Sequence, residues 1–169
     1  MRPGTTAGNT SRAGNLPQRD LRREAIRVVM RGEALTVPSG TTLAAGIAAL
    51  QAARSECLLV TRDGILVGIL TERDILFKIL GRDVDLLSPI DLFMTARPDT
   101  LTPDDTVGEA LALTDRGGYR HVPLTDGHGR PVALLRQQDV IAYLAEAFPE
   151  EILNLPPRPH QRMAGTDGA

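Results

Sequence analysis

Apolar and polar positions follow the same order twice between residues 34 and 147. Each time, a short extended segment leads into a helix, then into two apolar strands joined by a Gly/Asp turn, and then into a second helix. The first block predicts these elements at residues 34–37, 43–54, 57–61, 66–70 and 72–80. The second block predicts them at residues 100–102, 107–116, 121–125, 131–135 and 137–147. In this second block Thr102 and Pro103 suit the N-cap and first turn of the helix that follows.

The two blocks align residue by residue. An offset of 64 residues pairs Met30 with Met94, Thr36 with Thr100, Thr42 with Thr106, Leu43 with Val107, Leu58 with Val122, and Thr61 with Thr125. After one extra residue in the following turn, an offset of 65 pairs Val67 with Val132, Ile69 with Leu134, Leu70 with Leu135, Asp74 with Asp139, and Ile75 with Val140. A turn is where a repeat tolerates an insertion. The sequence therefore predicts an internal repeat.

A single β-α-β-β-α unit of about 60 residues can barely bury a core of its own. The strands are nearly all apolar, which is typical of a sheet covered by helices. We therefore expect an α/β (α+β) protein whose units, residues 21–82 and 83–148, pack across a pseudo-two-fold axis. Residues 1–20 and 149–169 are expected to be flexible tails. The Arg-rich segment 19–31 is interpreted as a solvated helix, with an amphipathic arm or a partner contact as alternatives.

Charge and composition narrow the range of partners. The 169 residues include 19 basic and 21 acidic ones, so the chain has no excess positive charge for a nucleic-acid backbone. Cys57 is the only cysteine, so we expect no intrachain disulfide. The three histidines lack metal-ligand spacing, so we expect no metal site. Residues 43–50, the longest apolar stretch, are too few to span a membrane, and the N-terminus lacks the apolar region of an export signal. We expect a cytoplasmic protein.

Short motifs recur at matching places in the two units. Residues 67–75 read Val-Gly-Ile-Leu-Thr-Glu-Arg-Asp-Ile and contain the pattern G-x-x-T-x-x-D. The second unit contributes Met94-Thr95 and the stretches at residues 102–107 and 118–124. Over about residues 24–147 the chain resembles a tandem pair of cystathionine-beta-synthase (CBS) domains, often called a Bateman module. The resemblance implies two pseudo-symmetric CBS repeats packed as one module that binds AMP, ADP, ATP or S-adenosylmethionine between them, often as a dimer, and without catalysis.

The segment from Gly68 to Asp74 is the first candidate site. Gly68 permits close approach of a ligand or of backbone. The Thr71 hydroxyl can donate to a phosphate, Arg73 lies between the motif residues, and Asp74 can accept both hydroxyls of a ribose. Thr71 and Asp74 also fit a helix N-cap with an acidic residue in the first turn, and that alternative stays open.

The resemblance implies partners for this segment in the second unit. Arg120 and His121 would reach across the axis toward the phosphates, because Arg offers a bidentate fork and His a further donor. Asp99 and Thr100 would lie near the adenine. A solvated charge for Arg120 and a strand-end residue for His121 are the alternatives.

The equivalent second pocket departs from the motif. Asp139 is retained, but Ala133 replaces the glycine and Arg136 the threonine. Arg136 is interpreted either as a phosphate contact or as a solvated charge, with Leu35 and Thr36 nearby. Glu56 and Cys57 are expected to face this pocket, where the carboxylate would repel a phosphate; Cys57 is otherwise a small buried apolar residue. We expect this pocket to be degraded, leaving one nucleotide per chain.

The leading functional hypothesis is a standalone regulatory module that senses an adenine nucleotide and changes how it associates with an effector protein. It predicts a homodimer, no required cofactor, no catalytic residue, and no contact with nucleic acid or a membrane. The alternative is a structural CBS dimerisation adaptor that binds no nucleotide. An enzyme is disfavoured because tails of about 20 residues are too short for a catalytic domain, and a DNA-binding protein because no helix-turn-helix remains beside the repeats.

Overall fold

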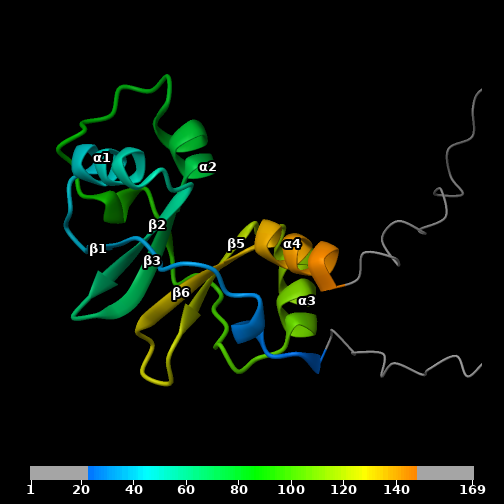
Figure 1. Cartoon of the computed structure of the whole chain (residues 1–169). Coiled ribbons are helices and arrows are strands. Elements are labelled where there is room, and N and C mark those ends of the chain that lie inside the picture. Colours follow the sequence, from blue (N-terminus) through cyan, green and yellow to red (C-terminus); the bar gives the residue numbers. More distant parts are fainter. Residues whose placement is uncertain (1–22, 148–169) are drawn as a thin grey trace, which may run out of the picture.

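The computed structural model describes residues 23–147, so the two tails expected to be flexible lie outside the described residues. Within this range the chain forms two repeats. Figure 1 shows helices α1 and α2 at one end of the molecule and α3 and α4 at the other. No helix in the described part is long and apolar enough to cross a membrane.

The first repeat contains a parallel pair of strands followed by a hairpin. Strand β1 runs parallel to β2, and β2 pairs antiparallel with β3. The elements in chain order are β1 (Thr36–Pro38), α1 (Leu43–Ala53), β2 (Cys57–Arg62), β3 (Ile65–Thr71), α2 (Glu72–Asp74) and the π-helical turn η3 (Ile75–Ile79). The predicted order is confirmed, although the second helix is built from a short α segment and a π turn.

The second repeat follows the same plan with a shorter sheet. Strands β5 and β6 form an antiparallel pair, and Leu101 makes only an isolated parallel bridge to Leu124 where the first repeat has β1. The elements are η4 (Ile90–Leu92), β4 (Thr95–Ala96), α3 (Val107–Gly117), β5 (His121–Thr125), β6 (Pro131–Arg136) and α4 (Gln137–Ala147). The repeat is visible in single hydrogen bonds: Glu72 N–H donates to Glu56 C=O at 3.0 Å, and Gln137 N–H donates to Arg120 C=O at 2.9 Å.

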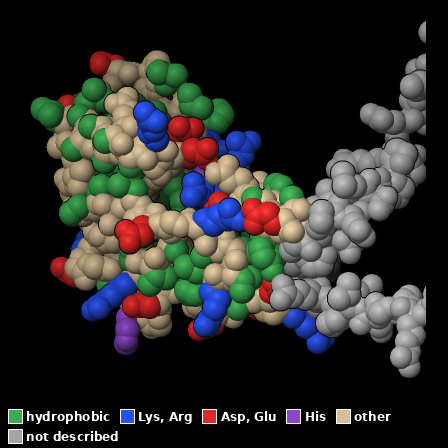
Figure 2. Space-filling model, viewed as in Figure 1, with side chains coloured by type: hydrophobic (Ala, Val, Ile, Leu, Met, Phe, Trp, Pro, Cys, Tyr) green, Lys and Arg blue, Asp and Glu red, His purple; other side chains and the backbone are tan. Residues whose placement is uncertain are grey.

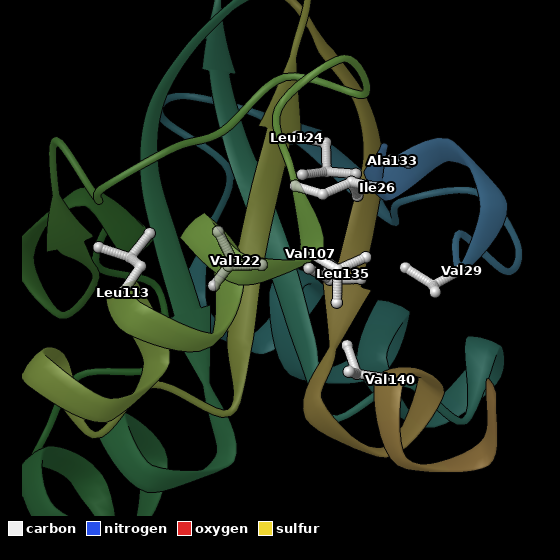
Figure 3. Close-up of a cluster of buried hydrophobic side chains, with 10 residues drawn as sticks. Ile26, Val29, Val107, Leu113, Val122, Leu124, Ala133, Leu135 and Val140 are labelled. Atoms are coloured by element: carbon white, nitrogen blue, oxygen red, sulfur yellow. The ribbon is translucent and has the colours of Figure 1, made fainter. Parts of the chain in front are cut away.

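Each core is completed by a segment from outside its own repeat. Ile26 and Val29, around the 3₁₀ turn η2 (Ile26–Val28), are buried among apolar side chains of the second repeat (Figure 3). Ile90 of η4 is buried in the core of the first repeat, and β4 extends the first sheet by pairing with β3. The interpretation of the Arg-rich segment as a solvated helix is therefore wrong for residues 23–31, because burial of Ile26 and Val29 holds the chain against the second repeat.

A third buried cluster joins the two sheets. Cys57, Leu59 and Ile69 from the first sheet pack with Leu134 from the second. Burying these side chains stabilises the pair as one unit, since apolar surface is removed from water at the junction. The junction brings the ends of β3 and β5 into the same region of the molecule.

One helix start differs from the prediction. The side chain of Thr106, not Thr102, caps α3, and it forms a reciprocal capping box with Glu109. Thr102 instead donates its N–H to the Asp105 carboxylate at 2.6 Å, in the turn before the helix. The pair Thr102-Pro103 is thus part of the connection into α3, and the Thr106 hydroxyl accepts the N–H of Glu109 in the first turn.

Candidate functional site

The junction between β3 and α2 holds Thr71 and Asp74 in a fixed arrangement. The Thr71 hydroxyl and the Thr71 N–H both donate to Asp74 Oδ2, at 2.7 and 2.9 Å, and Asp74 N–H donates to the Thr71 hydroxyl at 3.3 Å. Thr71 is the N-cap of α2, so the helix-cap interpretation of the motif is confirmed. The same hydrogen bonds orient the two side chains that the ligand-binding interpretation requires.

Lys78, the only lysine in the sequence, holds the other oxygen of Asp74. Its Nζ lies 2.7 Å from Asp74 Oδ1 and donates to the Phe93 carbonyl at 2.6 Å. Burial alone would raise the pKa of Asp74, but hydrogen bonds from Lys78 and Thr71 and the charge of Lys78 outweigh it and lower the pKa. Asp74 is therefore a carboxylate at neutral pH, with its acceptor oxygens fixed in place.

A cavity of about 370 Å³ opens beside this carboxylate, between the two repeats. Six of the eight residues predicted for the first site line it: Thr71, Arg73, Asp74, Asp99, Arg120 and His121. Segments that are distant in the sequence therefore form one pocket of a size that suits a small molecule. Figure 2 shows acidic and basic side chains lying side by side over the junction between the repeats.

Gly68 and Thr100 are not among the lining residues of this cavity. A Cβ at position 68 would lie 2.2 Å from the Met94 sulfur, so the glycine makes room for Met94 as β4 crosses β3. Thr100 is an exposed residue next to the bridge made by Leu101. The group that approaches Gly68 closely is therefore the side chain of Met94 and not a ligand or the backbone.

His121 contacts Glu56, which the sequence analysis assigned to the second pocket. Its Nε2 lies 3.0 Å from Glu56 Oε2, and both residues line the cavity of the first site. Glu56 was expected to face the second pocket; the structure places it in the lining of the first cavity, because β2 and β5 begin close together at the junction and Glu56 reaches His121. Burial lowers the pKa of His121 and exceeds the opposing effect of Glu56, while Arg136 and Arg120 lower the pKa further.

The second candidate site is occupied by its own arginine. Arg136 Nε donates to Asp139 Oδ2 at 3.2 Å, and Arg136 Nη2 donates to the Arg31 carbonyl at 3.3 Å. Asp139 is buried beneath this contact. Leu35 packs against the core of the first repeat, and Thr36 is an exposed residue of β1. The guanidinium of Arg136 thus takes the place that the threonine hydroxyl has in the first repeat.

Cys57 is buried next to these groups. The pKa of its thiol is raised to about 12, mainly by burial. The charge of Glu56 also raises this pKa, and the charge of Arg136 lowers it. The thiol is therefore protonated at neutral pH and unsuited to act as a nucleophile or a metal ligand. The interpretation of Cys57 as a small buried apolar residue is confirmed.

Several lining residues were not found from the sequence. Thr95, Arg97 and Pro98 line the cavity from the chain around the end of β4, and Tyr119 lines it from the turn before β5. The Tyr119 hydroxyl donates to Asp99 Oδ2 at 3.0 Å. Arg97 and Pro98 lie between the motif Met94-Thr95 and Asp99, so their position in the sequence was a usable signal.

Comparison with known proteins identifies the class of this fold. The model of the CBS domain family matches residues 19–81 and 90–146, and the chain belongs to this family as a tandem CBS pair. It is 33% identical over 136 residues to the CBS domain-containing protein CBSCBSPB5 of Arabidopsis thaliana, covering 71% of this chain and 25% of the relative. It is 34% identical over 80 residues to an uncharacterized 17.7 kDa protein of Acidianus ambivalens, covering 47% of this chain and 48% of that protein. The chain thus spans about a quarter of the length of the plant relative.

Solved structures share the fold. The CBS domain pair of protein MJ0100, in complex with methylthioadenosine and S-adenosyl-L-methionine, has a TM-score of 0.66 at 21% identity and covers 73% of this chain and 98% of its own. CBSX2 in complex with AMP has a TM-score of 0.62 at 19% identity, covering 73% and 97%. The CBS-domain protein ATU1752 of Agrobacterium tumefaciens has a TM-score of 0.63 at 22% identity, covering 71% and 98%. The mixed α/β fold of paired CBS repeats is confirmed.

Proposed function

We propose that this chain is a regulatory module that senses an adenosine-containing ligand, AMP, ADP or ATP, in the cavity between its CBS repeats and thereby alters its association with an effector protein. One observation carries the proposal: Thr71, Asp74, Arg120 and His121, from both repeats, line a single cavity. A ligand in that cavity contacts both repeats and can change how they sit against each other.

The chemistry of the lining suits a nucleotide. The ionised Asp74 accepts hydrogen bonds from ribose hydroxyls, and guanidinium groups such as that of Arg120 donate to phosphate oxygens. The proposal is supported by the similar folds of CBSX2, solved with AMP, and MJ0100, solved with S-adenosyl-L-methionine. S-adenosylmethionine is therefore the second ligand to test, and no cofactor is required.

We further propose that each chain binds one nucleotide. In the second repeat the Arg136 guanidinium already donates to Asp139, so a ribose would have to displace it. In the first repeat the Thr71 hydroxyl, a much smaller group, makes the equivalent contact with Asp74. The module is proposed to act as a cytoplasmic homodimer, without contact with nucleic acid.

Isothermal titration calorimetry of the full chain with AMP, ADP, ATP and S-adenosylmethionine tests the function. We expect one site per chain, and we expect Asp74→Ala to weaken binding by at least about tenfold, which is the loss of about 1.4 kcal/mol of binding free energy. The matched variant Asp139→Ala should change the affinity by less than about twofold. Because the Asp74 side chain is also part of the capping box of α2, Asp74→Asn is the control that retains an acceptor oxygen for the Thr71 N–H.

The outcomes separate the two hypotheses. Absence of binding by all four ligands would favour a structural CBS adaptor that binds no nucleotide. Two equivalent sites per chain, or equal losses from Asp74→Ala and Asp139→Ala, would contradict the single-site proposal while retaining the ligand-binding one.

A further inference from the structure

Three arginines that line the cavity between the repeats have no side-chain partner among the described residues. Arg73, Arg97 and Arg120 all line this cavity and are all exposed. Within residues 23–147 none of the three pairs with a carboxylate or donates a side-chain hydrogen bond. Elsewhere in the described part, Arg27, Arg31, Arg62 and Arg136 pair with a carboxylate, whereas Arg54, Arg82 and Arg116 do not. Arg73, Arg97 and Arg120 differ from these in that they line one cavity, from both repeats.

The carboxylates of the same cavity are mostly engaged. Glu56 contacts His121 at 3.0 Å, Asp74 accepts from Thr71 and pairs with Lys78, and Asp99 accepts from Tyr119 at 3.0 Å. Among the described lining residues, Glu72 is the one carboxylate without such a partner. The side chains left to bind a ligand are thus mainly guanidinium donors, and they require an anion.

The backbone at Arg97 adds a second observation. Arg97 has a φ of 48°, in the left-handed region that residues other than glycine adopt uncommonly. Its N–H donates to the Val67 carbonyl at 3.0 Å, which fixes this conformation directly after β4. A strained residue held by the sheet edge and lining a cavity is typical of a functional position.

We propose that this cavity prefers an adenosine polyphosphate, ATP or ADP, over AMP, with Arg97 among the residues that determine this preference. The inference rests on the proposed nucleotide-binding function. A guanidinium binds phosphate oxygens through two parallel hydrogen bonds, and three arginines at different places around the cavity can bind the oxygens of more than one phosphate group. Each added phosphate brings further negative charge and acceptor oxygens to these donors. Because the three side chains are exposed, the phosphate chain can extend along them toward solvent.

Calorimetry with the full chain in magnesium-free buffer tests the preference. We expect ATP to bind about tenfold or more tightly than AMP, with ADP between them. Arg97→Gln should weaken ATP binding by at least about fivefold and AMP binding by less than about twofold. The ratio of the ATP affinity to the AMP affinity should therefore decrease. Arg73→Gln is a second variant that we expect to decrease the ratio of the ATP affinity to the AMP affinity. The matched control is Arg82→Gln, since Arg82 is exposed, lies outside the cavity, and carries the same charge.

The outcomes distinguish this inference from the function on which it rests. If AMP binds as tightly as ATP, or if Arg97→Gln and Arg82→Gln change the ATP affinity equally, the polyphosphate preference is overturned while nucleotide binding stands. If no adenine nucleotide binds, both proposals fail. Inorganic tripolyphosphate is the remaining probe: binding as tight as that of ATP would overturn the role of the nucleoside, and much weaker binding supports it.

Discussion

At the scale of single residues, two interpretations of one motif turn out to involve the same atoms. Thr71 caps α2 and, through the same hydroxyl, orients the Asp74 carboxylate beside the cavity. Lys78 then holds the other oxygen of that carboxylate and links it to the Phe93 carbonyl. A ribose that binds Asp74 must share or displace the contact with Lys78. In the proposed function, Lys78 would thus connect the ligand to Phe93, in the chain that joins the two repeats.

The burial of His121 predicts a pH dependence of stability. Burial holds the pKa of His121 in the folded protein below its ordinary value of 6.5, so over this interval the unfolded chain binds more protons than the folded one. The free energy of unfolding should therefore decrease as the pH falls through 6.5 and below. Urea unfolding at about pH 7.5 and about pH 5.5 measures the change through the linear dependence on denaturant.

The variant His121→Gln identifies the residue responsible. Glutamine retains a donor for Glu56 but does not titrate, so the difference between the two pH values should become smaller. His128→Gln is the control, because His128 lies in the exposed turn between β5 and β6. An unchanged pH difference in His121→Gln would show that other groups are responsible.

At the scale of elements, threonine begins three of the helices. Thr42, Thr71 and Thr106 are the N-caps of α1, α2 and α3, and each side chain accepts an N–H from the first turn. The last two belong to reciprocal capping boxes, with Asp74 and with Glu109. An acidic residue three positions after the threonine is thus a sequence signal for the starts of α2 and α3.

This arrangement predicts the effect of removing one cap. Thr106→Ala should lower the free energy of unfolding by about 1 kcal/mol, because an N–H group at the start of α3 loses its acceptor. Chemical denaturation measures the difference. Thr106→Ser keeps the hydroxyl and should remain close to the wild type. Equal losses in the alanine and serine variants would indicate packing of the threonine methyl group instead of capping.

At the scale of the whole molecule, the surface of the first repeat exposes large apolar side chains. Leu76 and Phe77 of η3 are 58% and 69% exposed, and Leu80, directly after η3, is 68% exposed. The outer positions of the neighbouring helix α1 are mainly alanines. Large apolar side chains exposed close together on one segment are typical of an association surface.

We therefore expect a homodimer in which this face of the first repeat is buried. Sedimentation equilibrium at protein concentrations on the order of tens of micromolar should give twice the chain mass, since a symmetric dimer is the commonest oligomer. Phe77→Ser should shift the equilibrium toward the monomer. Val132→Ser is the matched control, because Val132 is an exposed apolar residue of the second repeat. A single species of 18.2 kDa in the wild type would contradict the prediction.

The sequence by itself determined the repeat, the order of the elements and most of the first candidate site. These features depend on local patterns: apolar periodicity, threonine three residues before an acid, and a motif that occurs twice in register. Thr71 and Asp74 were found because a strand end and a helix start are adjacent in the chain. The pairing of Met94 with Met30 indicated an equivalence between the units, although it gave no sign that Met94 covers Gly68.

The tertiary structure alone decided which segments meet. Ile26 belongs to the core of the second repeat, Glu56 contacts His121, Arg136 covers Asp139, and Arg97 reaches the cavity. Each of these contacts depends on how the two sheets pack or on local side-chain geometry. Neither can be predicted from the pattern of residue types along the chain. These contacts follow from burial at the junction. The two sheets remove their apolar residues from water by packing together, and this packing also positions the charged groups at the ends of the strands.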